Sequence, residues 1–271
     1  MISFENIVVY GFEAAIRGMR NPMNSWDRSD SWFYDFTDGV NGEKYDINHN
    51  VEPCTENEIG QMLDYIIGQA DLDLMRRLYK AGSEHRKFMR MINITMDITA
   101  PLYWWKEFDT YKVGTVVNSC STMHKIAERP FSIEDFSTEH LFKVLDGEDD
   151  DFVDSCCLWV DDVFEMSASA RDEICMRMNV APCAFPMDIM ESIVTLLNTC
   201  RDLYLETNNK CFWWQMIQLL PSSYNQKRTV QFSYETAAKI IEQRSNHKLD
   251  EWQGMSKLLD GVMPYLHTIM N

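Results

Sequence analysis

The stretch WWKEFDTYKVGTVVNSCSTMH, from Trp104 to His124, decides how this chain is interpreted. It joins bulky aromatics and three closely spaced charges to a run of small hydroxyl and thiol side chains. Pro101 stands just upstream, where a proline suits the first turn of a helix, and the pattern predicts a helix from there to about Phe108. We therefore expect a binding loop that is entered from a buried helix.

The segments on either side of this stretch combine strand and helix patterns. Residues 91–98 partly alternate and include β-branched residues, which is typical of a strand, and a second short strand is predicted at 7–10. Apolar residues at helical spacing predict helices at about 72–80, 187–205, 233–244 and 250–263. The simplest architecture with this content is one α+β domain over residues 1–271.

Residues 20–56 differ from the rest because they are rich in Asn, Asp, Gly, Pro and Ser and carry several aromatics. We expect a loop-rich aromatic arm here, either a functional loop or a surface arm pinned by its aromatics. Thr55 and Glu58 form a capping box, and apolar residues from Ile59 to Ile67 predict a helix after it. The acidic segment 146–154 lacks the ligand spacing of a calcium loop, so a solvated loop is expected rather than a cation site.

The composition restricts the classes of function. A net charge of −17 makes binding to nucleic acids or anionic membranes unfavourable. No apolar run reaches the length of a membrane span. None of the 8 cysteines forms a CxxC or a zinc-type spacing with histidine, so no metal site is expected. Without a signal-peptide pattern, we interpret them as reduced, mostly buried thiols of a cytoplasmic protein.

The opening stretch resembles the signature QxxRHRxxSxxExSxRY of the flavin-dependent thymidylate synthases (ThyX). Set on that signature without gaps, this chain has Glu107 for the Gln, Thr110-Tyr111-Lys112 for the Arg-His-Arg, Thr115 and Cys120 for the two serines, Asn118 for the Glu, and Thr122-Met123 for the Arg-Tyr. The upstream segment DLMRRLYKAGSEHRKF is similar to the family's helix, turn and Glu-His element. The resemblance implies an α+β fold of the ThyX type, with a mixed sheet and long helices.

A second resemblance lies near the C-terminus. After Leu220-Pro221, Ser233-Tyr234-Glu235 occupies the family's Asn-x-Arg position and Arg244 that of an arginine that contacts the nucleotide. The resemblance implies FAD, NADPH and methylenetetrahydrofolate as cofactors, dUMP as the ligand, and a homotetramer. It implies that a flavin is bound by Thr110, Lys112, Thr115 and His85, and a nucleotide by Glu107, Cys120, Thr122 and Arg244. The catalytic residue is unknown.

The departures from the family pattern have physical consequences. Arg-His-Arg supplies cationic donors to phosphates, whereas Thr110 offers one hydroxyl and Lys112 lacks the bidentate fork. Glu107 and Glu235 place carboxylates where the family has neutral or cationic groups. We infer a divergent nucleotide-binding protein with lost thymidylate synthase activity. The alternatives are active FAD-dependent methylation of dUMP and an acidic protein-binding inhibitor.

Other candidate groups have more than one interpretation. The cluster of His85, Arg86, Lys87 and Arg90 is either a charge-balancing surface patch or an anion pocket. Cys120 and His124 have the i,i+4 spacing of a nucleophile and its base, but no third partner is visible. The doublets Trp104-Trp105 and Trp213-Trp214 are typical of a core or subunit interface rather than of stacking platforms.

Overall fold

The computed structural model describes residues 2–33, 65–141, 143–144, 158–160, 163–166 and 186–271. It divides into two compact units. The first, which we call the sheet unit, is formed by Ile2–Thr99, Lys106–Ser119 and Lys227–Asn271. The second, the helical-pair unit, is formed by Ala100–Trp105 and Cys120–Gln226.

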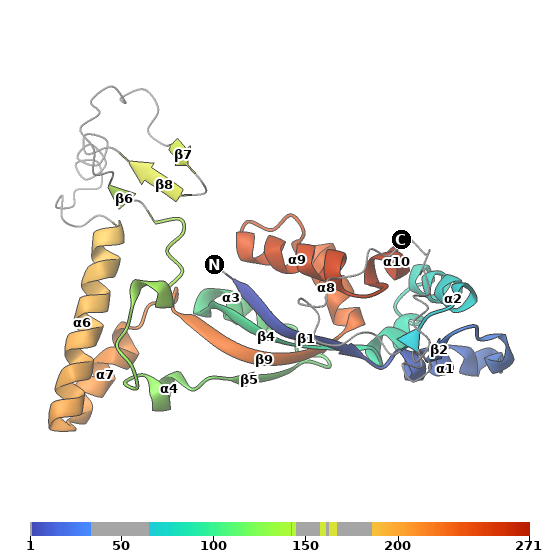
Figure 1. The fold of residues 1–271 in the computed structure, drawn as a ribbon, viewed down its shortest axis with the longest axis horizontal. Helices are drawn as coiled ribbons and strands as arrows, with labels where there is room; N and C mark the ends of the chain where they lie inside the picture. The colour runs from blue at the N-terminus through green and yellow to red at the C-terminus, as the bar shows by residue number, and fades with distance from the viewer. Residues whose placement is uncertain (1, 34–64, 142, 145–157, 161–162, 167–185) are drawn as a thin grey trace, which may run out of the picture. The chain divides into compact units, whose positions relative to one another are not determined.

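A four-stranded sheet organises the sheet unit, with the strand order β1-β4-β9-β5 (Figure 1). The strands are β1 (Ser3–Tyr10), β4 (Asn93–Pro101), β9 (Asn225–Ser233) and β5 (Val116–Ser119). β1 pairs antiparallel with β4, and β5 antiparallel with β9. β4 alternates between buried and partly exposed side chains, as a strand with one covered face does.

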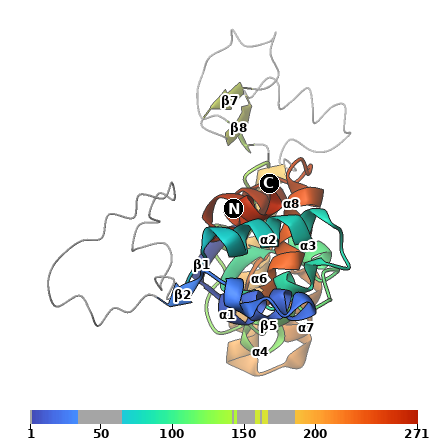
Figure 2. The same cartoon turned by 90° about the vertical axis from the view of Figure 1, so that its right-hand side faces the viewer.

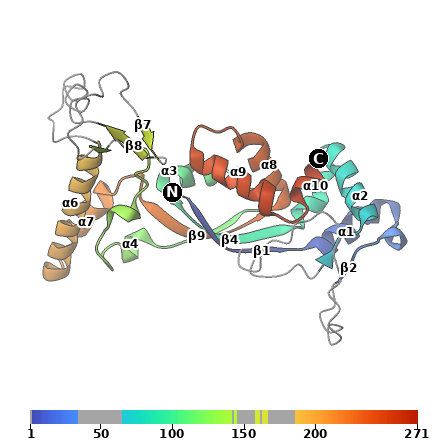
Figure 3. The same cartoon turned by 45° about the horizontal axis from the view of Figure 1, so that its top comes forward.

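Helices cover the apolar face of this sheet. α8 (Tyr234–Arg244) and α9 (Asp250–Val262) lie over it in Figures 1 and 3, and Figure 2 shows α2 (Gln69–Lys80) on the same side as α8. α3 (Leu102–Phe108) brings Phe108 to within 6.0 Å of the Phe232 ring of β9 and 6.4 Å of the Trp252 ring of α9. Because these three aromatics are fully buried, their contacts fix the end of α3 against the sheet.

The other face of the sheet carries polar side chains. Asp97 of β4 accepts hydrogen bonds from Thr229 of β9 at 2.6 Å and from Asn6 of β1 at 2.9 Å. These two bonds hold the pKa of Asp97 below its usual value. The polar network therefore joins three adjacent strands on the face that the helices leave open.

Gly11 shows why β1 can pass directly into α1 (Phe12–Arg20). Its φ of +99° lies in the left-handed region, and a Cβ there would lie 2.1 Å from the carbonyl oxygen of Met91. Any other residue would therefore be both strained and in collision with the backbone. The sequence prediction of this strand is confirmed.

A buried carboxylate secures the first part of the predicted arm. Asp71 of α2 is fully buried and accepts hydrogen bonds from Arg20 Nε at 2.6 Å, Ser29 Oγ at 2.6 Å and Ser31 Oγ at 2.7 Å. Asp30 in turn accepts from the backbone N–H groups of Ala70 and Asp71 at the start of α2. The segment 29–31 is thereby fastened to the helix by its own side chains.

The pairing of the residues that follow this segment contradicts the helix predicted from Ile59 to Ile67. Trp32–Phe33 (β2) pairs antiparallel with Tyr65–Ile66 (β3), so the helix expected at 59–67 does not include Tyr65 and Ile66. Pairing with β2 satisfies their backbone groups and overrides the helical spacing of their side chains. The described part of the arm, 20–33, contains the short 3₁₀ turns Asn21–Met23 and Trp26–Arg28. Residues 34–64 of the arm and predicted helix, like the acidic segment 146–154, lie outside the described residues.

The helical-pair unit has its own core. α6 (Pro186–Thr207) and α7 (Lys210–Leu219) pack together, and the buried cluster is formed by Ile126, Phe131, Phe136, Met190, Leu197, Cys200 and Met216. α4 (Thr122–Lys125), the strands β6 (Lys143–Val144), β7 (Leu158–Val160) and β8 (Val163–Met166), and the 3₁₀ turn Ile133–Asp135 complete it. The Trp104 and Trp105 rings are edge-on at 4.9 Å and fully buried, which confirms their assignment to a core.

The cysteines differ in part from the expectation of mostly buried thiols. Among the described cysteines all are free, but only Cys200 is buried, so the prediction of mostly buried thiols is wrong for Cys120 and Cys211. Both lie at the ends of elements, where solvent reaches them: Cys120 follows β5 and Cys211 is in the first turn of α7. No described helix combines the length and the apolar character needed to cross a membrane, and no cluster of metal-ligating side chains occurs within the described ranges.

Replacing Asp71 by Asn should lower the free energy of unfolding by about 3–5 kcal/mol, because Arg20 would keep a buried charge without its counterion. Burial alone raises the pKa of Asp71, but hydrogen bonds from Ser29, Ser31 and Arg20 outweigh it, so the net pKa is lowered. A lowered pKa means that this stabilisation is present above about pH 4 and is lost as the pH falls through the folded-state value.

Urea unfolding at neutral and acidic pH measures both effects. Asp73→Asn on the exposed side of the same helix is the matched control and should cost less than about 1 kcal/mol. Equal costs for the two substitutions would contradict the assigned role of Asp71.

Candidate functional site

The loop that follows α3 is closed by its own backbone and one side chain. The Thr110 N–H and hydroxyl both donate to the carbonyl of Glu107, at 3.0 and 2.7 Å. Gly114, with a φ of +70°, then turns the chain into β5. The Thr110 hydroxyl is therefore already occupied by the protein, which limits the flavin contact that the resemblance implies for it.

Arg244, the last residue of α8, is held above two aromatic rings. Its guanidinium carbon lies 4.8 Å from the centre of the Trp252 ring and 5.9 Å from that of Tyr111. Its Nε donates to the Tyr111 hydroxyl oxygen at 3.0 Å, and this hydroxyl donates to Gln243 Oε1 at 3.0 Å. Stacking and hydrogen bonding together fix the orientation of the guanidinium.

Glu107 is the counterion of Arg244. Its Oε2 lies 3.3 Å from Arg244 Nη1 and 3.6 Å from His247 Nε2. This oxygen is buried and neither contact has hydrogen-bond alignment, so the attraction to Arg244 is ionic. The carboxylate and the arginine that the resemblance assigns to nucleotide binding are thus brought together, and they neutralise each other.

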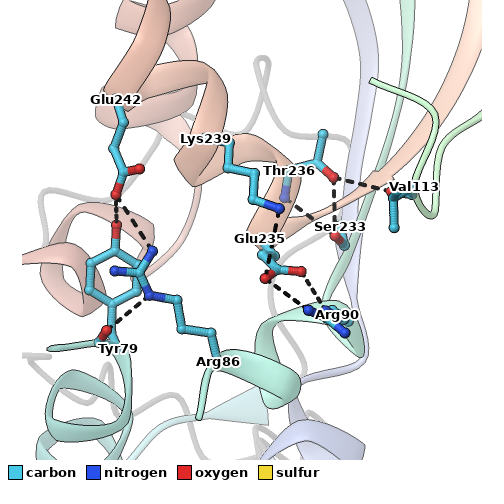
Figure 4. Close-up of polar contacts among 9 residues, drawn as sticks. All are labelled: Tyr79, Arg86, Arg90, Val113, Ser233, Glu235, Thr236, Lys239 and Glu242. Atoms are coloured by element: carbon cyan, nitrogen blue, oxygen red, sulfur yellow. Dashed lines mark hydrogen bonds and ion pairs between the residues drawn. The ribbon is translucent and has the colours of Figure 1, made fainter. Parts of the chain in front are cut away.

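The second carboxylate at a family position is paired in the same way. Glu235, near the start of α8, accepts two hydrogen bonds from Arg90, at 2.5 Å from Nε and 3.2 Å from Nη2 (Figure 4). Lys239 Nζ lies 3.9 Å from Glu235 Oε1. The hydrogen bond from Arg90 lowers the pKa of Glu235 despite its burial, so this carboxyl is ionised at neutral pH.

Tyr79 and Glu242 form a third polar contact along α8. The Tyr79 hydroxyl donates to Glu242 Oε1 at 2.5 Å, and Arg86 lies over the Tyr79 ring at 3.8 Å (Figure 4). Burial, followed by the hydrogen bond with Glu242, raises the pKa of Tyr79 to about 12. The phenol is therefore neutral throughout the physiological range.

The opening loop is also fastened to the start of α8. Ser233 Oγ caps this helix by accepting from the Thr236 N–H at 3.4 Å, and Thr236 Oγ1 donates to the Val113 carbonyl at 3.4 Å (Figure 4). Thr115, two residues further, has a buried hydroxyl with no hydrogen-bond partner in the structure. An unsatisfied buried hydroxyl is costly, which marks Thr115 as a residue to examine for a ligand.

The remaining predicted site residues are dispersed. Lys112 is exposed on the loop, and His85 is exposed just before the 3₁₀ helix η4 (Arg86–Arg90). Cys120 and Thr122 belong to the helical-pair unit, where the Cys120 carbonyl accepts from Gln226 Nε2 at 2.7 Å and Thr122 begins α4. Within the described residues no hydrogen bond joins Cys120 to His124, so nothing supports a nucleophile and base there.

The site contains partners that the sequence reasoning did not assign. Tyr111 lies in the stretch Trp104–His124, at a position where the family motif is replaced, and its phenol is the hydrogen-bond partner of Arg244. Trp252, Tyr79 and Glu242 belong to no sequence motif that indicates a site. Arg90 was included in the basic cluster, but its pairing with Glu235, 145 residues away, has no local signal.

The architecture defines a fold of the flavin-dependent thymidylate synthase class, with both helices and an antiparallel sheet in the expected order. Two crystal structures of ThyX from Helicobacter pylori with FAD and dUMP each align with a TM-score of 0.55. One is 13% identical and covers 100% of this chain and 97% of its own, and the other is 14% identical and covers 99% and 97%.

A third structure is a UMP/dUMP methylase, PolB, from Streptomyces cacaoi, with a TM-score of 0.48, 11% identity and coverage of 96% of this chain and 88% of that one. Comparison with protein-family profiles and with curated sequences gives no match. The likeness to the two ThyX structures confirms the fold class predicted from the sequence.

Replacing Tyr111 by Phe tests the geometry around Arg244. The ring below the guanidinium is kept, but the oxygen that accepts from Arg244 and donates to Gln243 is lost. We expect the free energy of unfolding to fall by about 1–3 kcal/mol, since one of the two bonds involves a charged group. Chemical denaturation measures this, with Tyr10→Phe on an exposed strand position as the control, which should change little. A Tyr111 effect no larger than that of Tyr10 would disprove the assigned contacts.

Proposed function

We propose that this chain is a nucleotide-binding protein of the ThyX fold in which flavin-dependent thymidylate synthesis is lost. The observation that supports this proposal most strongly is that each carboxylate at a family ligand position is paired with an arginine, Glu107 with Arg244 and Glu235 with Arg90. The charge of each of these two arginines is therefore offset by a carboxylate within the protein.

Binding of FAD would require donors for its pyrophosphate. The Arg-His-Arg of the family is replaced, the Thr110 hydroxyl donates to the Glu107 carbonyl, and only the exposed Lys112 keeps a positive charge on this loop. A pyrophosphate near Arg244 would approach the Glu107 carboxylate or have to displace it. Since repulsion between anions increases as water is removed, FAD in the family's position is disfavoured.

A pyrimidine nucleotide is a better fit than a flavin. Arg244 keeps 21% of its side chain exposed while its orientation is fixed by Trp252 and Tyr111. A mononucleotide has one phosphate group to accommodate rather than a pyrophosphate, and Arg244 can contact another part of the nucleotide after a small shift of Glu107. The ThyX structures with the same fold contain dUMP, which supports a nucleotide of this kind. The homotetramer implied by the resemblance and the cytoplasmic location inferred from the cysteine pattern remain part of this proposal.

The purified protein should be colourless and should leave the visible spectrum of added FAD unchanged. We also expect no dTMP from dUMP when FAD, NADPH and methylenetetrahydrofolate are supplied, because the protein cannot provide the hydride chemistry of the flavin. Absorption spectroscopy after gel filtration and chromatography of the nucleotides measure the two outcomes. Flavin bands that stay with the protein, together with dTMP formation, would favour the alternative of an active FAD-dependent methylation.

Replacing Glu107 by Gln should strengthen dUMP binding by about tenfold, because Arg244 would lose its internal counterion but keep its aromatic support. Arg244→Gln should weaken the binding by a similar factor. Isothermal titration calorimetry with dUMP measures both. Asp109→Asn is the matched control, since it removes a charge two residues away that pairs with Arg228 rather than with Arg244. If Glu107→Gln and Asp109→Asn have the same effect, Glu107 does not compete with the nucleotide.

A further inference from the structure

A group of cations lies along α8, away from Arg244. Glu235, Lys239 and Glu242 follow one another at intervals of four and three residues, so they share one face of the helix. Opposite them, η4 contributes Arg86 and Arg90 (Figure 4). We call these three cations and two carboxylates the α8 cluster.

The carboxylates of the cluster are not shared equally among the cations. Arg90 holds Glu235 with two hydrogen bonds, and Arg86 lies 3.6 Å from Glu242 while its Nε donates to the Tyr79 carbonyl. Among the carboxylates that the structure describes, Lys239 reaches only Glu235, at 3.9 Å, and Glu235 is already paired with Arg90. Lys239 is therefore a cation in excess, and 47% of its side chain is exposed.

Arg90 presents one edge to Glu235 and the other outward. Its Nε and Nη2 donate to the carboxylate, so the two N–H groups of Nη1 point away from it. The Arg90 side chain is 51% exposed, whereas that of Glu235 is 6% exposed. A nearly buried carboxylate thus orients a half-exposed guanidinium, which reduces the entropy lost when the outward edge binds a ligand.

The local charge is opposite to that of the whole chain. Residues 84–90 and 235–242 contain four cations, Arg86, Lys87, Arg90 and Lys239, and three carboxylates, Glu84, Glu235 and Glu242. This leaves one positive charge in excess, in a protein with a net charge of −17. An anion that is repelled by most of the surface is therefore attracted here.

We propose that Arg90 and Lys239, with Glu235 as the orienting carboxylate, form a binding subsite for a phosphate group. Nη1 offers two N–H donors and the ammonium of Lys239 offers three, which suits the several oxygens of a phosphate monoester better than the two of a carboxylate. This deepens the proposed nucleotide binding and rests on it for the identity of the ligand. The shared chemistry is a phosphate monoester, whether it belongs to a nucleotide or to a free phosphate.

Titration calorimetry with inorganic phosphate, dUMP and deoxyuridine at constant ionic strength tests the subsite. Lys239→Gln should weaken the binding of phosphate and of dUMP by about tenfold or more. Lys87→Gln removes the same charge from the exposed surface of η4, the 3₁₀ helix that carries Arg90, and should change the affinity less than about twofold. The double variant Arg90→Gln/Glu235→Gln removes the pair without leaving a buried charge and should weaken binding as Lys239→Gln does.

The outcomes separate this subsite from the proposed function. If dUMP binds and Lys239→Gln does not weaken it, the subsite is refuted while nucleotide binding stands. If inorganic phosphate binds through Lys239 but dUMP does not bind, the subsite stands and the nucleotide proposal fails. Equal losses of affinity in Lys87→Gln and Lys239→Gln would show that the positive charge of this region attracts anions without a specific site. Equal affinity for deoxyuridine and dUMP would show that the phosphate is not recognised. Either of these results would overturn the inference.

Discussion

The direct passage from β9 into α8 is the constraint on which the site depends. Ser233 is both the last residue of the strand and the cap of the helix, and the Tyr234 N–H donates to the Ile92 carbonyl at 2.9 Å, just before β4 begins. Without a connecting loop, the helix cannot rotate or slide relative to the sheet. Glu235, Glu242 and Arg244 of α8 therefore face fixed partners, and Glu235 meets Arg90 because Arg90 ends the segment that leads into β4.

This rigid placement explains why carboxylates are tolerated at both family positions. The nearly buried charge of Glu235 would cost several kcal/mol without a counterion, and the fold brings an arginine close to it and to the partly exposed Glu107. The pairs also decide what the surface can offer a ligand. Arg244 is directed inward against Trp252 and Glu107, whereas Arg90 keeps an outward edge. Two arginines with similar partners therefore have different capacities for binding.

The sequence predicted those features that have a local physical cause. Apolar spacing located α2, α6, α8 and α9, and the alternation around Ile94 located β4. It failed at Tyr65 and Ile66, where pairing with a distant strand outweighs helical spacing. For the site, the motif comparison selected Glu107 and Arg244 separately, but no local pattern showed that they form an ion pair. Contacts such as Arg90 with Glu235 depend on tertiary structure and have no sequence period.

The stacking of Arg244 on Trp252 has an optical consequence. An indole ring is polarised by a nearby cation, and the guanidinium lies 4.8 Å from the centre of this one, which is fully buried and stacks on Phe108. The emission of Trp252 therefore depends on where the charge of Arg244 lies. Any ligand that draws the guanidinium off the ring will change the fluorescence of the protein, so the candidate site contains its own spectroscopic reporter.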